Sequence, residues 1–148
     1  MARKILLPID LNIADGDQGT LEAALHILDE GGTLHVVTVV PDYGFPVISE
    51  QLDRTRETSM IETVRVALAK WVAAHVPEGV EARTQVLSGT LYDQIIRTAA
   101  RIGVDMIVIG AHRPGLGDYL IGSNAARVVR HAKQSVHVVR RPHGRSGR

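Results

Sequence analysis

Residues 104–110 read Val-Asp-Met-Ile-Val-Ile-Gly, and this short apolar run that ends in a glycine decides the fold. Similar runs occur at Ile5–Ile9, Leu34–Val40 and Val136–Val139. Strands that are apolar on both faces are typical of a parallel sheet covered by helices on both sides. A fifth run, Val80–Leu87, alternates polar and apolar residues, which predicts a strand nearer an edge of the sheet.

Helical patterns, with apolar residues three and four positions apart, separate these runs. They cover Thr20–Leu28, about 52–76, Leu91–Ile102 and about 123–132. The pair Gly31–Gly32 is expected to end the first helix and Pro77 the second. In the last helix, the spacing predicts that Ala125, Val128 and Val129 face inward.

Strict alternation of strands and helices predicts an α/β fold, an open five-stranded parallel sheet with helices on both faces. The length suits one domain over residues 1–148. In such sheets, ligands bind beyond the carboxyl ends of the strands, where the strand order reverses. The loops that begin at Asp10, Pro41 and Gly110 are therefore the places to look for a site.

Composition narrows the function classes. The net charge is +1 and aromatic residues make up 3% of the chain, which gives no case for nucleic-acid binding. The chain has no cysteine, which excludes disulfides and thiolate metal sites and fits a cytoplasmic protein. No apolar stretch approaches the length of a membrane span, and residues 141–148 are expected to form a flexible basic tail.

The loop after the fourth run is the most informative. Residues 110–124 read Gly-Ala-His-Arg-Pro-Gly-Leu-Gly-Asp-Tyr-Leu-Ile-Gly-Ser-Asn. A helix N-terminus suits phosphate because of its unpaired N–H groups and its dipole. Gly110 and Gly122 allow close backbone approach, and Ser123 and Asn124 add donors. The alternative is that the segment 122–124 only caps the helix.

Other side chains extend this predicted phosphate site. His112 and Arg113 add donor or positive character to the same loop. Asp10 ends the first strand, where a carboxylate can accept hydrogen bonds from ribose or hold phosphate-bound Mg²⁺, or can serve only as a turn residue. The chain lacks the Gly-Lys-Ser/Thr of a Walker A loop, the glycine fingerprint of dinucleotide folds and a Gly-x-Ser-x-Gly elbow.

With these residues in place, the whole chain resembles the universal stress protein family. The segments that carry the resemblance are Lys4–Asp10, Val86–Gly89, Asp105–Gly110 and Ser135–Arg140. The segments 112–114, 119–126 and 128–132 resemble the enterobacterial F and G types. The resemblance implies a Rossmann-like fold of the adenine-nucleotide alpha-hydrolase kind. It also implies a homodimer that pairs through the strand Val136–Val139.

The nucleotide-binding branch of this family carries Gly-x2-Gly-x9-Gly-Ser/Thr. Here Gly110 and Gly122-Ser123 match its ends, but Arg113 stands at the second glycine. Eleven residues separate Gly110 from Gly122, one fewer than in the pattern. The F and G types are implied to bind ATP without that glycine, and Arg113 is expected to replace it with a charged contact to phosphate.

The resemblance implies a cytoplasmic ATP-binding stress protein, a nucleotide-dependent regulator or sensor rather than an enzyme. The implied nucleotide-binding residues are Pro8, Ile9, Asp10, Val39, Val40, Gly110, His112, Arg113, Gly122, Ser123 and Asn124. Asp10 is also the expected contact to nucleotide-bound Mg²⁺. Two alternatives stay open: an interaction module that binds no nucleotide, and a slow ATPase that uses His112 as its base.

Overall fold

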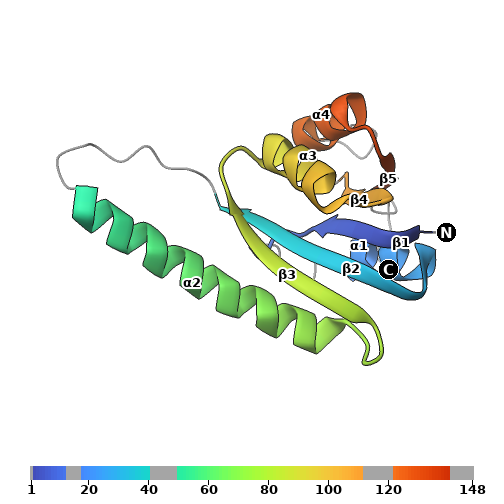
Figure 1. Ribbon diagram of the computed structural model, residues 1–148, viewed down its shortest axis with the longest axis horizontal. Helices are drawn as coiled ribbons and strands as arrows, with labels where there is room; N and C mark the ends of the chain where they lie inside the picture. Colours follow the sequence, from blue (N-terminus) through green and yellow to red (C-terminus); the bar gives the residue numbers. More distant parts are fainter. Residues whose placement is uncertain (1, 13–17, 41–49, 112–121, 141–148) are drawn as a thin grey trace, which may run out of the picture.

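The computed structural model describes residues 2–12, 18–40, 50–111 and 122–140. Strands and helices alternate along the chain, as predicted (Figure 1). The elements are β1 (Ala2–Pro8), α1 (Gln18–Ile27), β2 (Leu28–Val40), α2 (Glu50–His75), β3 (Glu81–Ser88), α3 (Leu91–Ile102), β4 (Met106–Gly110), α4 (Ser123–His131) and β5 (Ser135–Val139). None of the helices described is both long and apolar enough to cross a membrane.

The sheet is parallel, with the strand order β3-β2-β1-β4-β5. This arrangement confirms the predicted fold class and the edge position of the alternating run, which forms β3. In Figure 1, α3 and α4 lie together on one side of the sheet, and α2 runs along the other side beside β3.

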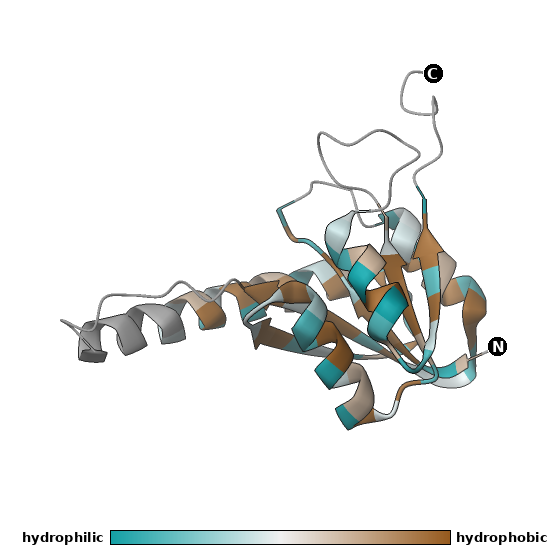
Figure 2. Ribbon diagram, turned by 90° about the horizontal axis from the view of Figure 1, so that it is seen from above, coloured by the Kyte–Doolittle hydropathy of each residue, from teal (hydrophilic) through white to brown (hydrophobic). Residues whose placement is uncertain are grey.

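Successive residues of the central strands point to opposite faces and build two cores. Ile5 and Leu7 of β1 pack with Leu68 of α2 in the first core. Leu6 of β1 packs with Ile95 of α3 and Val128 of α4 in the second. Figure 2 accordingly shows hydrophobic residues along the strands and a mixture of hydrophobic and hydrophilic residues on the helices. These two layers explain why the central strands read as continuous apolar runs.

The prediction that the glycine pair at 31–32 ends the first helix is wrong. Helix α1 ends at Ile27, and both glycines lie inside β2, where the pairing register with β1 shifts. Gly31 has a φ of +83°, and a Cβ on Gly32 would lie 2.7 Å from the carbonyl oxygen of Arg3. The glycines therefore allow a bulge in β2 next to β1.

Two other helices end at or just before a residue that is unfavourable inside a helix, and the end before Pro77 agrees with the prediction. Pro77 lies just beyond the end of α2, and Gly103 ends α3 with a φ of +76°. The N–H of Gly103 donates to the carbonyl of Ala99 at 3.0 Å, which closes the last turn of α3.

The prediction that Val129 faces inward is wrong. Val129 is 48% exposed, whereas the preceding Val128 is fully buried and Ala125 is 4% exposed. Residues 125 and 128 are three apart and share one face of α4. Val129 is rotated by about 100° from Val128 around a helix of 3.6 residues per turn, which turns it toward solvent.

Candidate functional site

The strand order reverses at β1, which lies between β2 and β4. β1 pairs with β2 as far as Pro8 and Val37, but its last described pair with β4 joins Leu6 to Ile107. β4 continues to Gly110 beside β5. β1 and β4 therefore part before their carboxyl ends, and this is the position where open α/β sheets bind ligands.

Ala111 directly follows β4 and is hydrogen-bonded to Gly122, the residue before α4. Its N–H donates to the carbonyl of Val139 at 2.8 Å, and its carbonyl accepts from the N–H of Gly122 at 3.3 Å. Ala111 is 4% exposed, so this junction is part of the packed structure. The two hydrogen bonds bring Gly110 and Gly122, far apart in the sequence, to the same edge of the sheet.

The N-terminus of α4 suits an anion. Gly122 is the N-cap residue and has no side chain that could accept from the first N–H groups of the helix. The first turn contains no acidic residue. Ser123 is exposed and Asn124 is half-buried. The segment 122–124 therefore begins the helix without a Ser or Asn side chain at the N-cap position, and the positive end of the dipole meets no carboxylate in that turn.

Of the three predicted residues at the end of β1, only Asp10 is exposed. The side chain of Ile9 belongs to the first core, its N–H donates to the Val37 carbonyl at 2.8 Å, and Pro8 is also buried. Oδ1 of Asp10 accepts from the N–H of Asn12 at 2.9 Å, an Asx-type turn. Asp10 is therefore the side chain that this segment can offer to a ligand.

Thr38, which is not among the residues predicted from the sequence, supports this segment. It is 6% exposed, and its Oγ1 donates to the carbonyl of Ile9 at 3.0 Å. The bond ties β2 to the residue directly before Asp10. The available signal was a hydroxyl inside the apolar run Leu34–Val40, because a buried hydroxyl needs a partner.

The carboxyl end of β2 carries the two valines predicted to contact adenine. Val39 is half-buried and packs against the second core, whereas Val40 is 9% exposed. The carbonyl of Val40 accepts from the N–H of Gly89 at 3.0 Å, which fixes the end of β2 to the turn after β3. Of the two side chains, Val39 is the more accessible from this edge of the sheet.

A cation–π contact joins the two helices that border this edge. Cζ of Arg127 in α4 lies 4.9 Å from the centroid of the Tyr92 ring in α3. Tyr92 is the second residue of α3, so the contact holds the N-terminal end of α3 against α4. No pattern within one segment of the sequence predicts this pair, because the two residues lie on different helices.

Several predicted features lie outside the described residues. They are His112, Arg113, the loop that begins at Pro41 and the basic tail 141–148. Among the side chains that the structure describes, those of residues 2–12, 18–40, 58–111 and 122–140, no three His, Asp or Glu come together to hold a metal ion.

Comparison with known proteins gives a consistent family relationship. The model of the universal stress protein family matches residues 1–140. Universal stress protein G of Shigella flexneri is 25% identical over 142 residues, which cover 95% of this chain and 100% of the relative. A universal stress protein of Methanocaldococcus jannaschii is 30% identical over 154 residues, which cover 95% of this chain and 83% of the relative. These matches confirm the resemblance found in the sequence, including that to the enterobacterial G type.

Solved structures confirm the fold. The hypothetical protein MJ0577 is 19% identical with a TM-score of 0.81, over 96% of this chain and 98% of its own. A universal stress protein in complex with cAMP is 19% identical with a TM-score of 0.56, over 93% and 97%. The universal stress protein from Archaeoglobus fulgidus in complex with dAMP is 22% identical with a TM-score of 0.54, over 93% and 97%.

Proposed function

The chain belongs to the universal stress protein family, and we propose that the carboxyl edge of its sheet binds an adenine nucleotide, ATP with Mg²⁺. The observation that carries the proposal is the Ala111–Gly122 hydrogen bond. It sets the N-terminus of α4 beside the end of β4, at the point where β1 and β4 part. Two related structures with cAMP and dAMP support an adenine nucleotide as the ligand class.

The phosphates would lie at the start of α4. Gly110 would give backbone access, Gly122 would start the helix without a capping side chain, and Ser123 and Asn124 would supply a hydroxyl and an amide. The absence of an acidic residue from the first turn of α4 favours an anion there. In this proposal, His112 and Arg113 add contacts from the same loop, and Arg113 takes the place of the family's second glycine.

The adenine would lie against the end of β2, at Val39 and Val40, and Asp10 would face the Mg²⁺ that the phosphates carry. Magnesium usually keeps one or two protein carboxylates and completes its shell with phosphate oxygens and water. A single exposed carboxylate at Asp10 fits that requirement. When bound, the ion would neutralise phosphate charge beside this edge of the sheet.

In the cell, the protein would act as a nucleotide-dependent stress regulator or sensor in the cytoplasm. Binding, rather than turnover, fits the residues at this edge. Asp10 is the exposed carboxylate at the end of β1, and its Oδ1 already accepts from the Asn12 N–H. A slow ATPase would need His112 as its base.

Equilibrium dialysis with labelled ATP tests the binding. We expect saturable binding at or below millimolar ATP, and nucleotide release when the purified protein is denatured. Ser123→Asp should weaken binding about tenfold or more, because it sets a carboxylate against the phosphates. The helix itself should tolerate the change, since an acidic residue in the first turn favours the dipole.

Ser135→Asp is the matched control, because it makes the same change at an exposed position. Ser135 starts β5 and therefore lies at the amino ends of the strands, opposite to the carboxyl edge. This variant should leave ATP affinity unchanged. No binding at millimolar ATP would favour the interaction module without nucleotide. Unchanged binding in Ser123→Asp would place the phosphates elsewhere.

We also propose that the protein forms a homodimer through β5. β5 pairs with β4 on one side, and no described strand pairs with its other side. Val136 and Val138 pack against the second core, so an apolar strand forms the edge. Apolar edge strands associate unless they are covered. Light scattering across micromolar concentrations should give the mass of a dimer, and a monomer throughout that range would contradict the proposal.

A further inference from the structure

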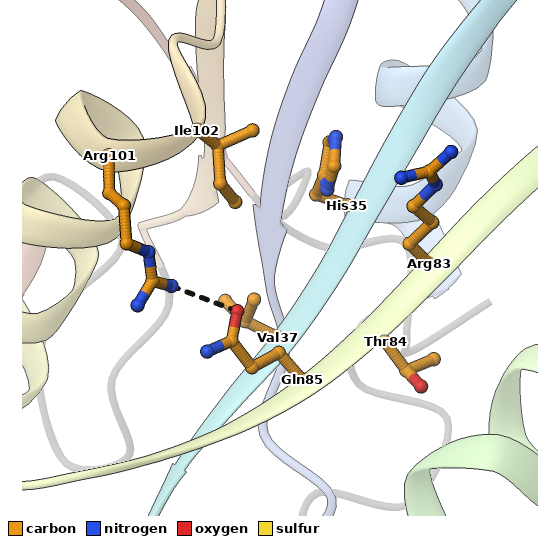
Figure 3. Close-up of a pocket in the computed structure, with 7 residues that line it drawn as sticks. All are labelled: His35, Val37, Arg83, Thr84, Gln85, Arg101 and Ile102. Carbon is orange, nitrogen blue, oxygen red and sulfur yellow. Dashed lines mark hydrogen bonds between the residues drawn. The ribbon is translucent and has the colours of Figure 1, made fainter.

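A recess lies on the face of the sheet that α3 covers, lined by residues of β2, β3 and α3 (Figure 3). It has a volume of about 300 Å³ and is open to solvent. The residues that line it are His35, Val37, Arg83, Thr84, Gln85, Arg101 and Ile102. Arg83 precedes Ser88, the end of β3, by five residues, which is about 17 Å at 3.3 Å per residue. The proposed nucleotide site lies beyond those strand ends, so Arg83 is separated from it, whereas Val37 at the base of the recess lies two residues before Val39 on the same face of β2.

The recess has an apolar base and a polar rim. Val37 is buried and Ile102 is half-buried, and both pack in the second core. Across them, Nη2 of Arg101 in α3 donates to Oε1 of Gln85 in β3 at 3.0 Å (Figure 3). This bond fixes the guanidinium between the helix and the edge strand.

The positive charge of the recess is poorly compensated. Among the described residues, no carboxylate oxygen lies within 4 Å of Arg101, whose acceptor Gln85 is neutral. Arg83 reaches Oε2 of Glu81 only at 3.9 Å, and its side chain is 68% exposed. Exposed ion pairs at this distance contribute little free energy. Both guanidinium groups therefore lack a close carboxylate partner among the described residues, and they border the recess from opposite sides (Figure 3).

His35 lies next to Arg83, because the two residues are register partners on β2 and β3. Burial lowers the pKa of His35, and the charges of Arg83 and Lys4 lower it further, against a smaller opposing effect of Glu81. The positive field of the neighbouring groups thus exceeds the negative one at this position. An anion in the recess would relieve that imbalance.

We propose that this recess binds a small molecule with an oxyanion group, a phosphate or a carboxylate, held by Arg83, Arg101 and His35. Guanidinium groups match both oxyanions in geometry and charge. Val37 and Ile102 would contact the apolar part of the ligand. Gln85 is a positioning residue. Its neutral amide oxygen holds the Arg101 guanidinium in place and does not compensate its positive charge. The volume of about 300 Å³ fits a small ligand.

Gln85→Glu tests the proposal with a change of nearly equal shape. The new carboxylate would pair with Arg101 and cancel charge in the recess. Inorganic phosphate and succinate are the probes, and NMR signals of the His35 ring and the Arg101 side chain are the readout. We expect saturable shifts in the natural protein, with the tighter probe identifying the ligand chemistry, and about tenfold weaker binding in Gln85→Glu.

Gln134→Glu is the matched control, because it changes the net charge equally beside β5, at the opposite edge of the sheet. It should leave the shifts unchanged. Arg101→Gln is the second variant and should also lose about tenfold in affinity. Its control is Arg97→Gln in the same helix, where Asp93 already pairs with the arginine at 2.9 Å.

The absence of shifts at His35 and Arg101 with both probes would overturn the proposal, as would equal affinity in Gln85→Glu. Ser123→Asp separates this recess from the nucleotide site. The variant should bind ATP about tenfold or more weakly and keep the phosphate or succinate shifts at His35. A loss of both in Ser123→Asp would mean that the probes act at the carboxyl edge instead, which would also overturn the proposal.

Discussion

Replacing Asp10 with asparagine should weaken the binding of magnesium ATP about tenfold to a hundredfold. Asparagine keeps an Oδ1 atom that accepts from the Asn12 N–H, so the turn after β1 should remain. The substitution removes the charge that would face Mg²⁺. Isothermal titration with and without magnesium separates the possible roles, because affinity for magnesium-free ATP should stay the same or rise.

Asp29→Asn is the matched control, since it removes one carboxylate near the start of β2, at the opposite end of the strands. It should leave nucleotide affinity unchanged. A loss in Asp10→Asn that is equal with and without magnesium would assign Asp10 to a ribose hydroxyl. Unchanged affinity in both conditions would leave Asp10 as a turn residue only.

Strand positions were predictable because a core on each face of the sheet requires apolar residues at successive positions of a strand. Runs such as Leu34–Val40 are apolar at successive positions, since each face of the strand meets a different helix layer. The bulge at Gly31–Gly32 was not predictable in this way. Two glycines after a helical pattern are typical of a helix end, and only the approach of Arg3 shows why β2 needs them.

The candidate site also has parts that local sequence predicts and parts that it does not. The loops at Asp10 and Gly110 could be chosen from the strand pattern and the rule for parallel sheets. The hydroxyl of Thr38 inside an apolar run shows that it needs a partner, but neither its bond to Ile9 nor the bond of Ala111 to Gly122 could be predicted, because each joins residues distant in sequence. The recess beside α3 is a stronger case. It brings together His35, Arg83 and Arg101, which come from two strands and a helix and form no motif.

Val128 and Val129 should respond oppositely to replacement by alanine, although they are neighbours in one helix. Val128→Ala removes buried methyl groups between α4 and the second core. It should lower the free energy of unfolding by about 2 kcal/mol relative to Val129→Ala. Both variants gain the higher helix propensity of alanine, about 0.5 kcal/mol, so their difference isolates the packing of Val128.

Urea denaturation of both variants at matched protein concentration measures this difference. Because Val129 is 48% exposed, Val129→Ala should be neutral or slightly stabilising. Equal losses in the two variants would show that Val129 is buried in the protein in solution. If the loss in Val129→Ala then shrank on dilution, it would indicate that a partner copy covers this side of α4, because only the stability of an associated state depends on concentration.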